Sequence, residues 1–284
     1  MQGKTVVFTG ATSGIGQAAA LALAKMGARV VFVARDRTRA EATLKRLEAA
    51  APRQGHSVHL ADLSSVAETR RVGRLIAETE PKVDVLVNNA GAMFADRRVT
   101  AEGLELTFAL NHMAYFLMTL ALSERLAASA PARIVSTAST AHQGESLDFS
   151  DLQSATGYNG WRAYGRSKLA NILFTREAAR RLKDAGVTAN CFHPGVIATR
   201  FGSASGGWTS LLVPLVRPFL ASPEAGADTL VYLASAQEAA NVTGGYFVKR
   251  QAVEPSAAAR DDKAAKRLWE ASEALAAPMV ATGT

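Results

Sequence analysis

The sequence contains a single cysteine, Cys191, among its 284 residues. One cysteine excludes an internal disulfide and fits a reducing compartment. On an apolar segment, this thiol is expected to be a buried packing residue rather than a nucleophile. No group of histidine, cysteine and acidic residues has the spacing of a metal site. We therefore expect neither a disulfide nor a metal in the chemistry of this chain.

Long apolar runs are also missing. The most membrane-like segment, TSLLVPLVRPFL at 209–220, is interrupted by Pro214, Arg217 and Pro218 and is too short to cross a bilayer. The N-terminus runs from a short polar start into a strand-like segment, so it does not read as a signal peptide, and Gln2 excludes N-terminal myristoylation. These absences predict a cytoplasmic protein without a membrane span.

Basic residues exceed acidic ones, with a formal net charge of +7 and a pI near 9.7. The arginines and lysines are nevertheless interleaved with acids, as at 34–48 and 259–270, and form no basic stripe with aromatic residues. Such interleaving is typical of solvated helix faces. Nucleic acid is therefore not an expected partner, and one anionic small-molecule site could use a few of the arginines.

With 48% hydrophobic and 20% charged residues, the chain has the composition of a folded domain with a sizeable core. Apolar strand-like segments alternate with amphipathic helix-like ones from the first residues onward. The strands are apolar on both faces, as in a parallel sheet between two helix layers. We predict strands at 5–10, 28–35, 57–63, 83–91, 132–139, 187–195 and 244–250, and helices at 16–27, 37–50, 65–79, 102–128, 161–185 and 223–235.

This alternation predicts an α/β fold: a single-domain, Rossmann-type, doubly wound parallel sheet with helices on both faces, formed by residues 1–250. Within it, the irregular hydrophobic segment at about 200–222 is predicted to be a lid over the substrate. Residues 251–284 are rich in alanine and are predicted to be a C-terminal extension, helical from about Ser256.

A glycine-rich turn, TGATSGIG at 9–16, lies between the first strand and the first helix. Gly10 permits a tight turn, and Gly14 and Gly16 let the backbone approach a pyrophosphate at the helix N-terminus. A plain strand-to-helix turn is the alternative, but the strand–turn–helix context favours a dinucleotide site. The predicted cofactor contacts in this turn are Gly10, Thr12, Ser13, Gly14, Ile15 and Gly16.

The end of the second strand is where an NAD site presents a carboxylate to the ribose 2′-hydroxyl. Here that position is Ala34, followed directly by Arg35, whose guanidinium suits a 2′-phosphate. Asp36 comes one residue later, and Arg37 and Arg39 either assist or belong to the helix surface. The sequence therefore favours NADP(H) over NAD(H) as the cofactor.

Several further motifs follow in order: NNAG at 88–91, ALNHMAYF at 109–116, IVSTAS at 134–139, YGRSK at 164–168 and HPGVIAT at 193–199. With the glycine turn, this set resembles the short-chain dehydrogenase/reductase family over residues 4–250. The segments ARD (34–36), AHQG (141–144) and SKLANILFTREAARRL (167–182), with the tail ARDDKAAKRLWEAS, resemble its retinol dehydrogenase-like branch.

The resemblance implies a role for each of four residues. Tyr164 is the general acid for carbonyl reduction and the base for alcohol oxidation, and Lys168, one helical turn away, favours the phenolate and can bond the nicotinamide ribose. Ser139 binds the substrate oxygen, with Ser136 and Thr137 as nearby hydroxyls, and Asn111 holds a water that links Lys168 to solvent.

The remaining implied contacts surround the cofactor. His193 is interpreted as a strand-end packing residue, and His142 is expected at most to line the mouth of the substrate site. The implied cofactor contacts, besides Tyr164 and Lys168, are Asp62 and Leu63 near the adenine, Asn88, Ala90 and Gly91 near the adenosine, and Pro194, Gly195, Val196 and Thr199 around the nicotinamide.

The predicted function is an NADP(H)-dependent oxidoreductase for a lipophilic, retinoid-like or other apolar aldehyde, ketone or alcohol. A non-catalytic NADP-binding sensor or scaffold is the alternative, although such proteins typically lose the tyrosine or lysine. A nucleotide-sugar epimerase or dehydratase fits less well, because it usually has a different glycine spacing and a larger C-terminal domain. The resemblance also implies a homodimer or homotetramer through the helices at 102–128 and 161–185, unless the C-terminal helix masks that surface.

Overall fold

The computed structural model describes residues 1–195 and 222–277. Most of the predicted lid, together with Val196 and Thr199, lies outside the described residues, as does the end of the C-terminal extension from 278 onward.

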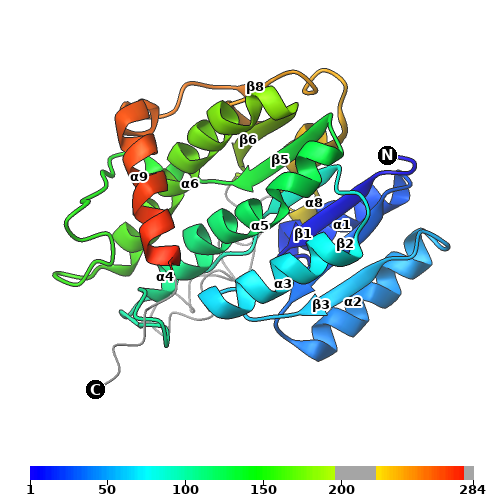
Figure 1. Ribbon diagram of the computed structural model, residues 1–284, viewed down its shortest axis with the longest axis horizontal. Coiled ribbons are helices and arrows are strands. Elements are labelled where there is room, and N and C mark those ends of the chain that lie inside the picture. The colour runs from blue at the N-terminus through cyan, green and yellow to red at the C-terminus, as the bar shows by residue number, and fades with distance from the viewer. Residues whose placement is uncertain (196–221, 278–284) are drawn as a thin grey trace.

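The described strands form one sheet in the order β3-β2-β1-β4-β5-β6-β7-β8 (Figure 1). All neighbours are parallel except the antiparallel pair β7 and β8. The order reverses between β1 and β4, and in doubly wound sheets the crevice at such a reversal is where ligands bind. The strands are β1 (Thr5–Thr9), β2 (Arg29–Ala34), β3 (Ser57–Leu60), β4 (Val85–Asn88), β5 (Ala132–Thr137), β6 (Val187–His193), β7 (Tyr246–Val248) and β8 (Gln251–Ala252).

Helices cover both faces of this sheet, as the fold prediction requires (Figure 1). On one face lie α1 (Gly14–Lys25), α2 (Arg37–Ala50) and α8 (Pro223–Ser235). On the other lie α3 (Val66–Thr79), α5 (Ala114–Ala128), α6 (Gly160–Leu182) and α9 (Asp262–Ala276). Shorter pieces are α4 (Leu106–Phe108), a π-helical turn at Ala109–Met113, and single 3₁₀ turns at Thr140–His142, Lys183–Ala185 and Ala258–Arg260.

The apolar strands explain why two helix layers form. Successive side chains of a strand point to opposite faces, so the fully buried Val7 joins the core beneath α3 and α5, while Val6 and Phe8 join the core beneath α1 and α8. Such a strand leaves neither face to water. Truncation of Phe8 to alanine would cost about 3–5 kcal/mol of stability.

The helix predicted at 102–128 is where expectation and structure differ most. The carboxylate of Glu105 accepts hydrogen bonds from the backbone N–H groups of Thr107 and Phe108, both at 2.8 Å, so the helix begins only at Leu106. A π-helical turn at Ala109–Met113 then interrupts it. The helical run Leu106–Ala128 is long and apolar enough to cross a membrane, but 72% of its most apolar window is buried inside the fold. That is the behaviour of a core helix.

The C-terminal extension differs from its prediction in two details. It begins with β8, a strand that pairs with β7, and its helix α9 starts at Asp262 rather than near Ser256, because the Asp261 side chain caps it. Helix α9 packs on α6: the Trp269 ring stacks on Phe174 with centroids 5.8 Å apart, and Leu268 is fully buried. The extension up to residue 277 therefore shares its apolar core with the sheet.

Candidate active site

In the glycine turn between β1 and α1, neighbouring backbone segments come so close that a side chain would not fit. Gly10 has a φ of +74°, and a Cβ placed there would lie 2.8 Å from the backbone of Ala90. A Cβ on Gly16 would lie 2.0 Å from the carbonyl oxygen of Gly10. Ser13 at the start of α1 makes no side-chain capping bond to the described residues, so the N–H groups of the first turn can bind an anion. This cradle fits the pyrophosphate of a dinucleotide.

Asn89 ties this turn to the neighbouring strands, a role that the sequence interpretation missed. Its amide nitrogen donates to Gly10 O at 3.1 Å, and its amide oxygen accepts from Thr137 Oγ1 at 3.0 Å. Asn88, the predicted contact, instead has a fully buried side chain that donates to Thr119 Oγ1 on α5 at 3.2 Å. The signal was the second asparagine of NNAG, since successive strand residues point to opposite faces.

The ends of β2 and β3 carry the charged groups predicted near the adenosine. The Arg35 side chain is 73% exposed and lies 3.5 Å from the Asp62 carboxylate. Burial raises the pKa of Asp62, but hydrogen bonds from Ser64 and the charge of Arg35 outweigh it, so the net pKa is lowered. The Asp36 carboxylate accepts from the backbone N–H of Arg39 at 2.8 Å and thereby caps α2. Leu63, by contrast, is buried in the core beneath α3.

Tyr164 and Lys168 lie one turn apart on α6, as the sequence predicts, and both are buried. The Lys168 ammonium is 5.5 Å from the centroid of the Tyr164 ring and donates to Thr137 O at 3.1 Å. Burial lowers the pKa of Lys168 to about 7. Burial also raises the pKa of Tyr164 to about 12, against a lowering by its hydrogen bond with Ser139. Burial therefore outweighs the hydrogen bond with Ser139, and the phenol holds its proton at neutral pH, as a proton donor requires.

Ser139 is the hydroxyl that meets Tyr164. It follows β5, and its Oγ accepts from the Ala141 N–H at 3.2 Å. The two alternative hydroxyls point elsewhere: Thr137 donates to Asn89, and the fully buried Ser136 Oγ has no hydrogen-bond partner among the described residues.

Asn111 lies in the π-helical turn, a feature that recurs at functional sites. Its amide oxygen accepts from Ala92 N, and its amide nitrogen donates to Ala92 O and Ser167 Oγ, all at 2.9 Å. The side chain thus joins the segment after β4 to α6.

The three loops that follow β4, β5 and β6 converge on α6. A Cβ on Gly91, after β4, would lie 3.0 Å from Asn111 Oδ1 and 3.6 Å from Lys168 Nζ. After β6 come Pro194 and Gly195, and Gly195 has a φ of +87°. The site thus has Tyr164, Lys168 and Ser139 at the carboxyl ends of the central strands, on the same edge of the sheet as the glycine turn.

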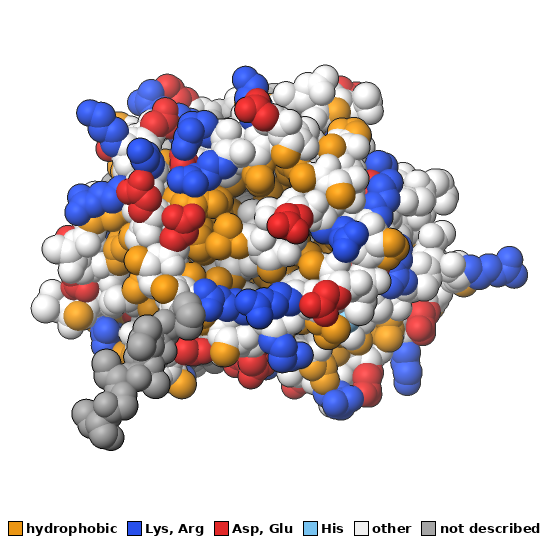
Figure 2. All heavy atoms as spheres, viewed as in Figure 1, with side chains coloured by type: hydrophobic (Ala, Val, Ile, Leu, Met, Phe, Trp, Pro, Cys, Tyr) orange, Lys and Arg blue, Asp and Glu red, His pale blue; other side chains and the backbone are white. Residues whose placement is uncertain are grey.

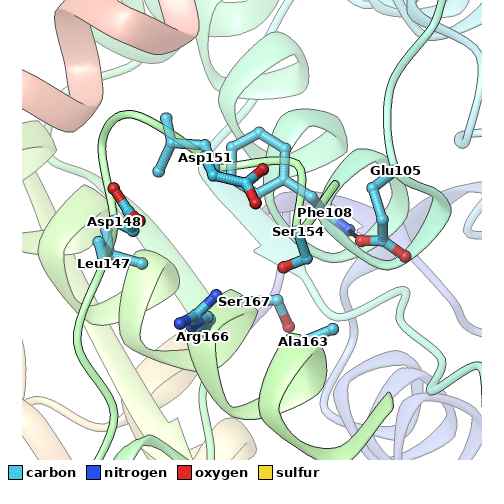
Figure 3. Close-up of a pocket in the computed structure, with 10 residues that line it drawn as sticks. Glu105, Phe108, Leu147, Asp148, Asp151, Ser154, Ala163, Arg166 and Ser167 are labelled. Carbon is cyan, nitrogen blue, oxygen red and sulfur yellow. Dashed lines mark hydrogen bonds between the residues drawn. The ribbon is translucent and has the colours of Figure 1, made fainter. Parts of the chain in front are cut away.

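His142, expected at most to line the mouth of the substrate site, is fully buried and bonds two backbone groups, Ser139 O and Ser256 N. A narrow pocket lies between α6 and the segment 147–154 that precedes it (Figure 3). Neither Tyr164 nor Ser139 lines that pocket, so it is separate from the reacting groups. Its lining comes from Glu105, Phe108, Leu147, Asp148, Asp151, Leu152, Ser154, Ala163, Arg166 and Ser167.

The surface agrees with the charge pattern of the sequence. Basic and acidic side chains are intermixed on the face that Figure 2 shows, where α9 and α3 flank α5. Among residues 1–195 and 222–277, no three histidine, cysteine or acidic side chains are grouped closely enough to hold a metal ion.

Comparison with known proteins agrees with this geometry. A family model described as short chain dehydrogenase matches residues 4–209. Retinol dehydrogenase 13 of Homo sapiens is 40% identical over 279 residues, which cover 96% of this chain and 84% of that protein. The structure of an uncharacterized Mycobacterium paratuberculosis protein has a TM-score of 0.77 at 31% identity, covering 97% of this chain and 94% of that one. The Pseudomonas aeruginosa RhlG/NADP active-site complex has a TM-score of 0.69 at 30% identity, covering 87% and 94%.

The chain therefore belongs to the short-chain dehydrogenase/reductase family, and within it to the retinol dehydrogenase-like branch. It is an oxidoreductase of the kind that uses a nicotinamide cofactor, on the doubly wound fold that its sequence predicted.

Proposed function

We propose that this protein is an NADP(H)-dependent oxidoreductase that interconverts an apolar aldehyde or ketone with its alcohol. The observation that carries the proposal is the meeting of Tyr164, Lys168 and Ser139 at the carboxyl ends of the central strands, beside the glycine cradle. A bound nicotinamide supplies the hydride in reduction and accepts it in oxidation.

The protein's own groups manage the oxygen of the substrate. In reduction, the Ser139 hydroxyl holds the carbonyl oxygen, and the Tyr164 phenol gives its proton to that oxygen as negative charge develops there. Lys168, with its pKa near 7, stabilises the phenolate left behind, and its bond to Thr137 O keeps the ammonium close to Tyr164. In oxidation the same groups act in reverse, with Tyr164 as the base.

Three observations support NADP(H) as the cofactor. Arg35 projects into solvent at the end of β2, where a guanidinium can bind a 2′-phosphate with paired, charge-assisted hydrogen bonds. The nearest carboxylate along the chain, Asp36, uses its Oδ1 to cap α2 and comes two residues after Ala34, where an NAD site presents its carboxylate. The solved relative RhlG is a complex with NADP.

Trp161 supports an apolar substrate. It is 61% exposed, more than the other large hydrophobic side chains of the described residues, and its ring lies 6.1 Å from that of Tyr164, one turn along α6. An exposed aromatic side chain beside the proton donor offers an apolar surface to a substrate. The similarity to retinol dehydrogenase 13, whose name gives a lipophilic alcohol, points the same way.

The test is NADPH oxidation at 340 nm with a panel of aldehydes and ketones, comparing the wild-type protein with Tyr164→Phe. The phenylalanine keeps the ring and removes only the hydroxyl that gives the proton, so turnover should fall by about 10²–10⁴-fold while NADPH binding, followed by fluorescence, persists. Turnover near the wild-type rate in the variant would disprove the role of Tyr164.

A further inference from the structure

One peptide unit beside Tyr164 is held from both sides by histidines. The carbonyl oxygen of Ser139 lies 2.6 Å from His142 Nδ1, and the N–H of Thr140, in the same peptide unit, donates to His193 Nδ1 at 3.4 Å. His142 comes from the 3₁₀ turn after β5, and His193 ends β6. This peptide determines where the Ser139 side chain points, because its orientation sets the backbone at Ser139.

The partners of His142 define which nitrogen carries its proton. The backbone N–H of Ser256 can only donate, so His142 Nε2, 3.2 Å away, accepts. The proton of the neutral ring is then on Nδ1, which donates to the Ser139 carbonyl. Both ring nitrogens are used, the residue is fully buried, and the ring packs edge-on against Tyr246 with centroids 5.3 Å apart. The ring therefore has a single orientation.

The turn that contains His142 is pressed against the catalytic helix. A Cβ on Gly165, the residue after Tyr164, would lie 2.6 Å from Ala141 O, so only a glycine lets the turn approach α6 this closely. The N–H of the same Ala141 bonds Ser139 Oγ. A shift of the turn would therefore move the serine hydroxyl relative to the phenol.

We infer that His142 is a positioning residue: it holds the Ser139–Thr140 peptide so that the Ser139 hydroxyl faces Tyr164, with Ser256 of the C-terminal extension fixing the ring. This inference rests on the proposed function, since it acts through Ser139. It also gives the segment after β8 a part in the site, although that segment contributes no reacting group.

The test uses the kcat and KM of four proteins: wild type, His142→Phe, Ser139→Ala and the double variant. Phenylalanine keeps a flat aromatic ring, somewhat larger than imidazole, and removes both hydrogen bonds. We expect His142→Phe to lower kcat by about 10–100-fold, because small misplacements of a reacting group have effects of this size, and to leave the KM for NADPH within about twofold. In the Ser139→Ala background, the same change should have little further effect on kcat.

His56→Phe is a matched control. His56 is also buried and also uses both ring nitrogens on backbone groups, Val30 N at 3.0 Å and Ala51 O at 3.2 Å, but it lies at the far end of β2 from the site. Its replacement should lower thermal stability as His142→Phe does, without the loss of kcat.

Two further variants cover the case in which His142→Phe does not fold. An asparagine amide reaches the position of Nδ1 and can donate to Ser139 O, whereas a glutamine amide reaches that of Nε2. His142→Asn should keep most of the kcat that His142→Gln loses. Equal rates for these two, or a loss from His142→Phe that is undiminished in the Ser139→Ala background, would overturn the inference. If Ser139→Ala itself kept the wild-type rate, the proposed role of Ser139 would fail as well, so the two failures are distinct.

Discussion

The site has two cations in opposite surroundings, Arg35 and Lys168. Arg35 lies at the end of β2 with 73% of its side chain exposed, beside a carboxylate. Lys168 is 2% exposed and bonds only a backbone carbonyl and the faces of two tyrosine rings among the contacts that the structure describes. Exposure leaves the Arg35 guanidinium accessible to an anion. Burial instead brings the pKa of Lys168 to about 7, into the range where it gains and loses a proton.

In the proposed function, this contrast separates binding from chemistry. The exposed end, built from loop residues and the starts of α1 and α2, is proposed to recognise charge. The buried end, built from α6 and from loops tied together by Asn89, Asn111 and His142, is proposed to control a proton. Changes at the two ends should therefore affect different kinetic constants.

The largest effect should come from Lys168→Met, which keeps the length of the chain and removes the ammonium. We expect kcat to fall by about 10²–10⁴-fold, because the phenolate then forms without a neighbouring positive charge. Denaturant unfolding should show little loss of stability, since a buried cation without a carboxylate partner is itself costly. Lys183→Met, in the 3₁₀ turn after α6, is the control, and a Lys168→Met enzyme with near-normal kcat would contradict the assignment.

Arg35→Ala should weaken binding of NADPH at the exposed end of the site, at the end of β2. Losing charge-assisted hydrogen bonds of about 1.5–3 kcal/mol would lower kcat/KM for NADPH by about 10–150-fold. The value for NADH should change little, because NADH has no 2′-phosphate. Lys45→Ala, exposed on the later part of α2, serves as the control. An unchanged ratio between the two cofactors would mean that Arg35 does not select NADP(H).

Burial also makes stability depend on pH. Burial lowers the pKa of His112 to about 3, and its side chain is 1% exposed. Because the folded pKa lies below the unfolded value of 6.5, its contribution is complete above pH 6.5 and is lost as the pH falls from there towards 3. At pH 5.5 this one group should lower the free energy of unfolding by about 1.4 kcal/mol.

Urea unfolding at pH 7.5 and 5.5 measures this loss, with His112→Phe as the comparison. The variant should lose less stability between the two pH values than the wild type does. The buried carboxylates Asp84 and Glu177 have lowered pKa values, so their contributions are lost at lower pH, as the pH falls from the ordinary carboxyl pKa downward. The same pH dependence in both proteins would show that His112 is not the group responsible.

The smallest effect should come from Trp161→Ala. The variant removes an exposed aromatic side chain whose contact with an apolar substrate contributes about 1 kcal/mol. It should lower kcat/KM for long-chain aldehydes by about fivefold and leave kcat/KM for short hydrophilic ones almost unchanged. Val99→Ala changes another exposed hydrophobic side chain, away from Tyr164, and serves as the control. A uniform decrease over all chain lengths would argue against Trp161 as part of the substrate surface.

Periodicity and motif order determined much of this protein. The uniformly apolar strands led directly to a parallel sheet between helices, because only residues buried on both faces have that pattern. The roles of Tyr164, Lys168 and Ser139 followed from the resemblance that the ordered motifs carry, and a helix brings Tyr164 and Lys168, four residues apart, to one face. Glycines at 10 and 16 were identifiable because their turn lies between a strand and a helix.

The tertiary structure decided which polar groups are buried and what they bond. Strand alternation places Asn88 and Asn89 on opposite faces, but only the packed structure shows that Asn88 bonds Thr119 on α5 while Asn89 bonds Gly10 and Thr137. The bond from His142 to Ser256 spans 114 positions of the chain, and the pKa values of Tyr164 and Lys168 are set by segments that pack over them. Sequence patterns record short-range geometry, whereas desolvation and long-range hydrogen bonds exist only once distant segments have packed together.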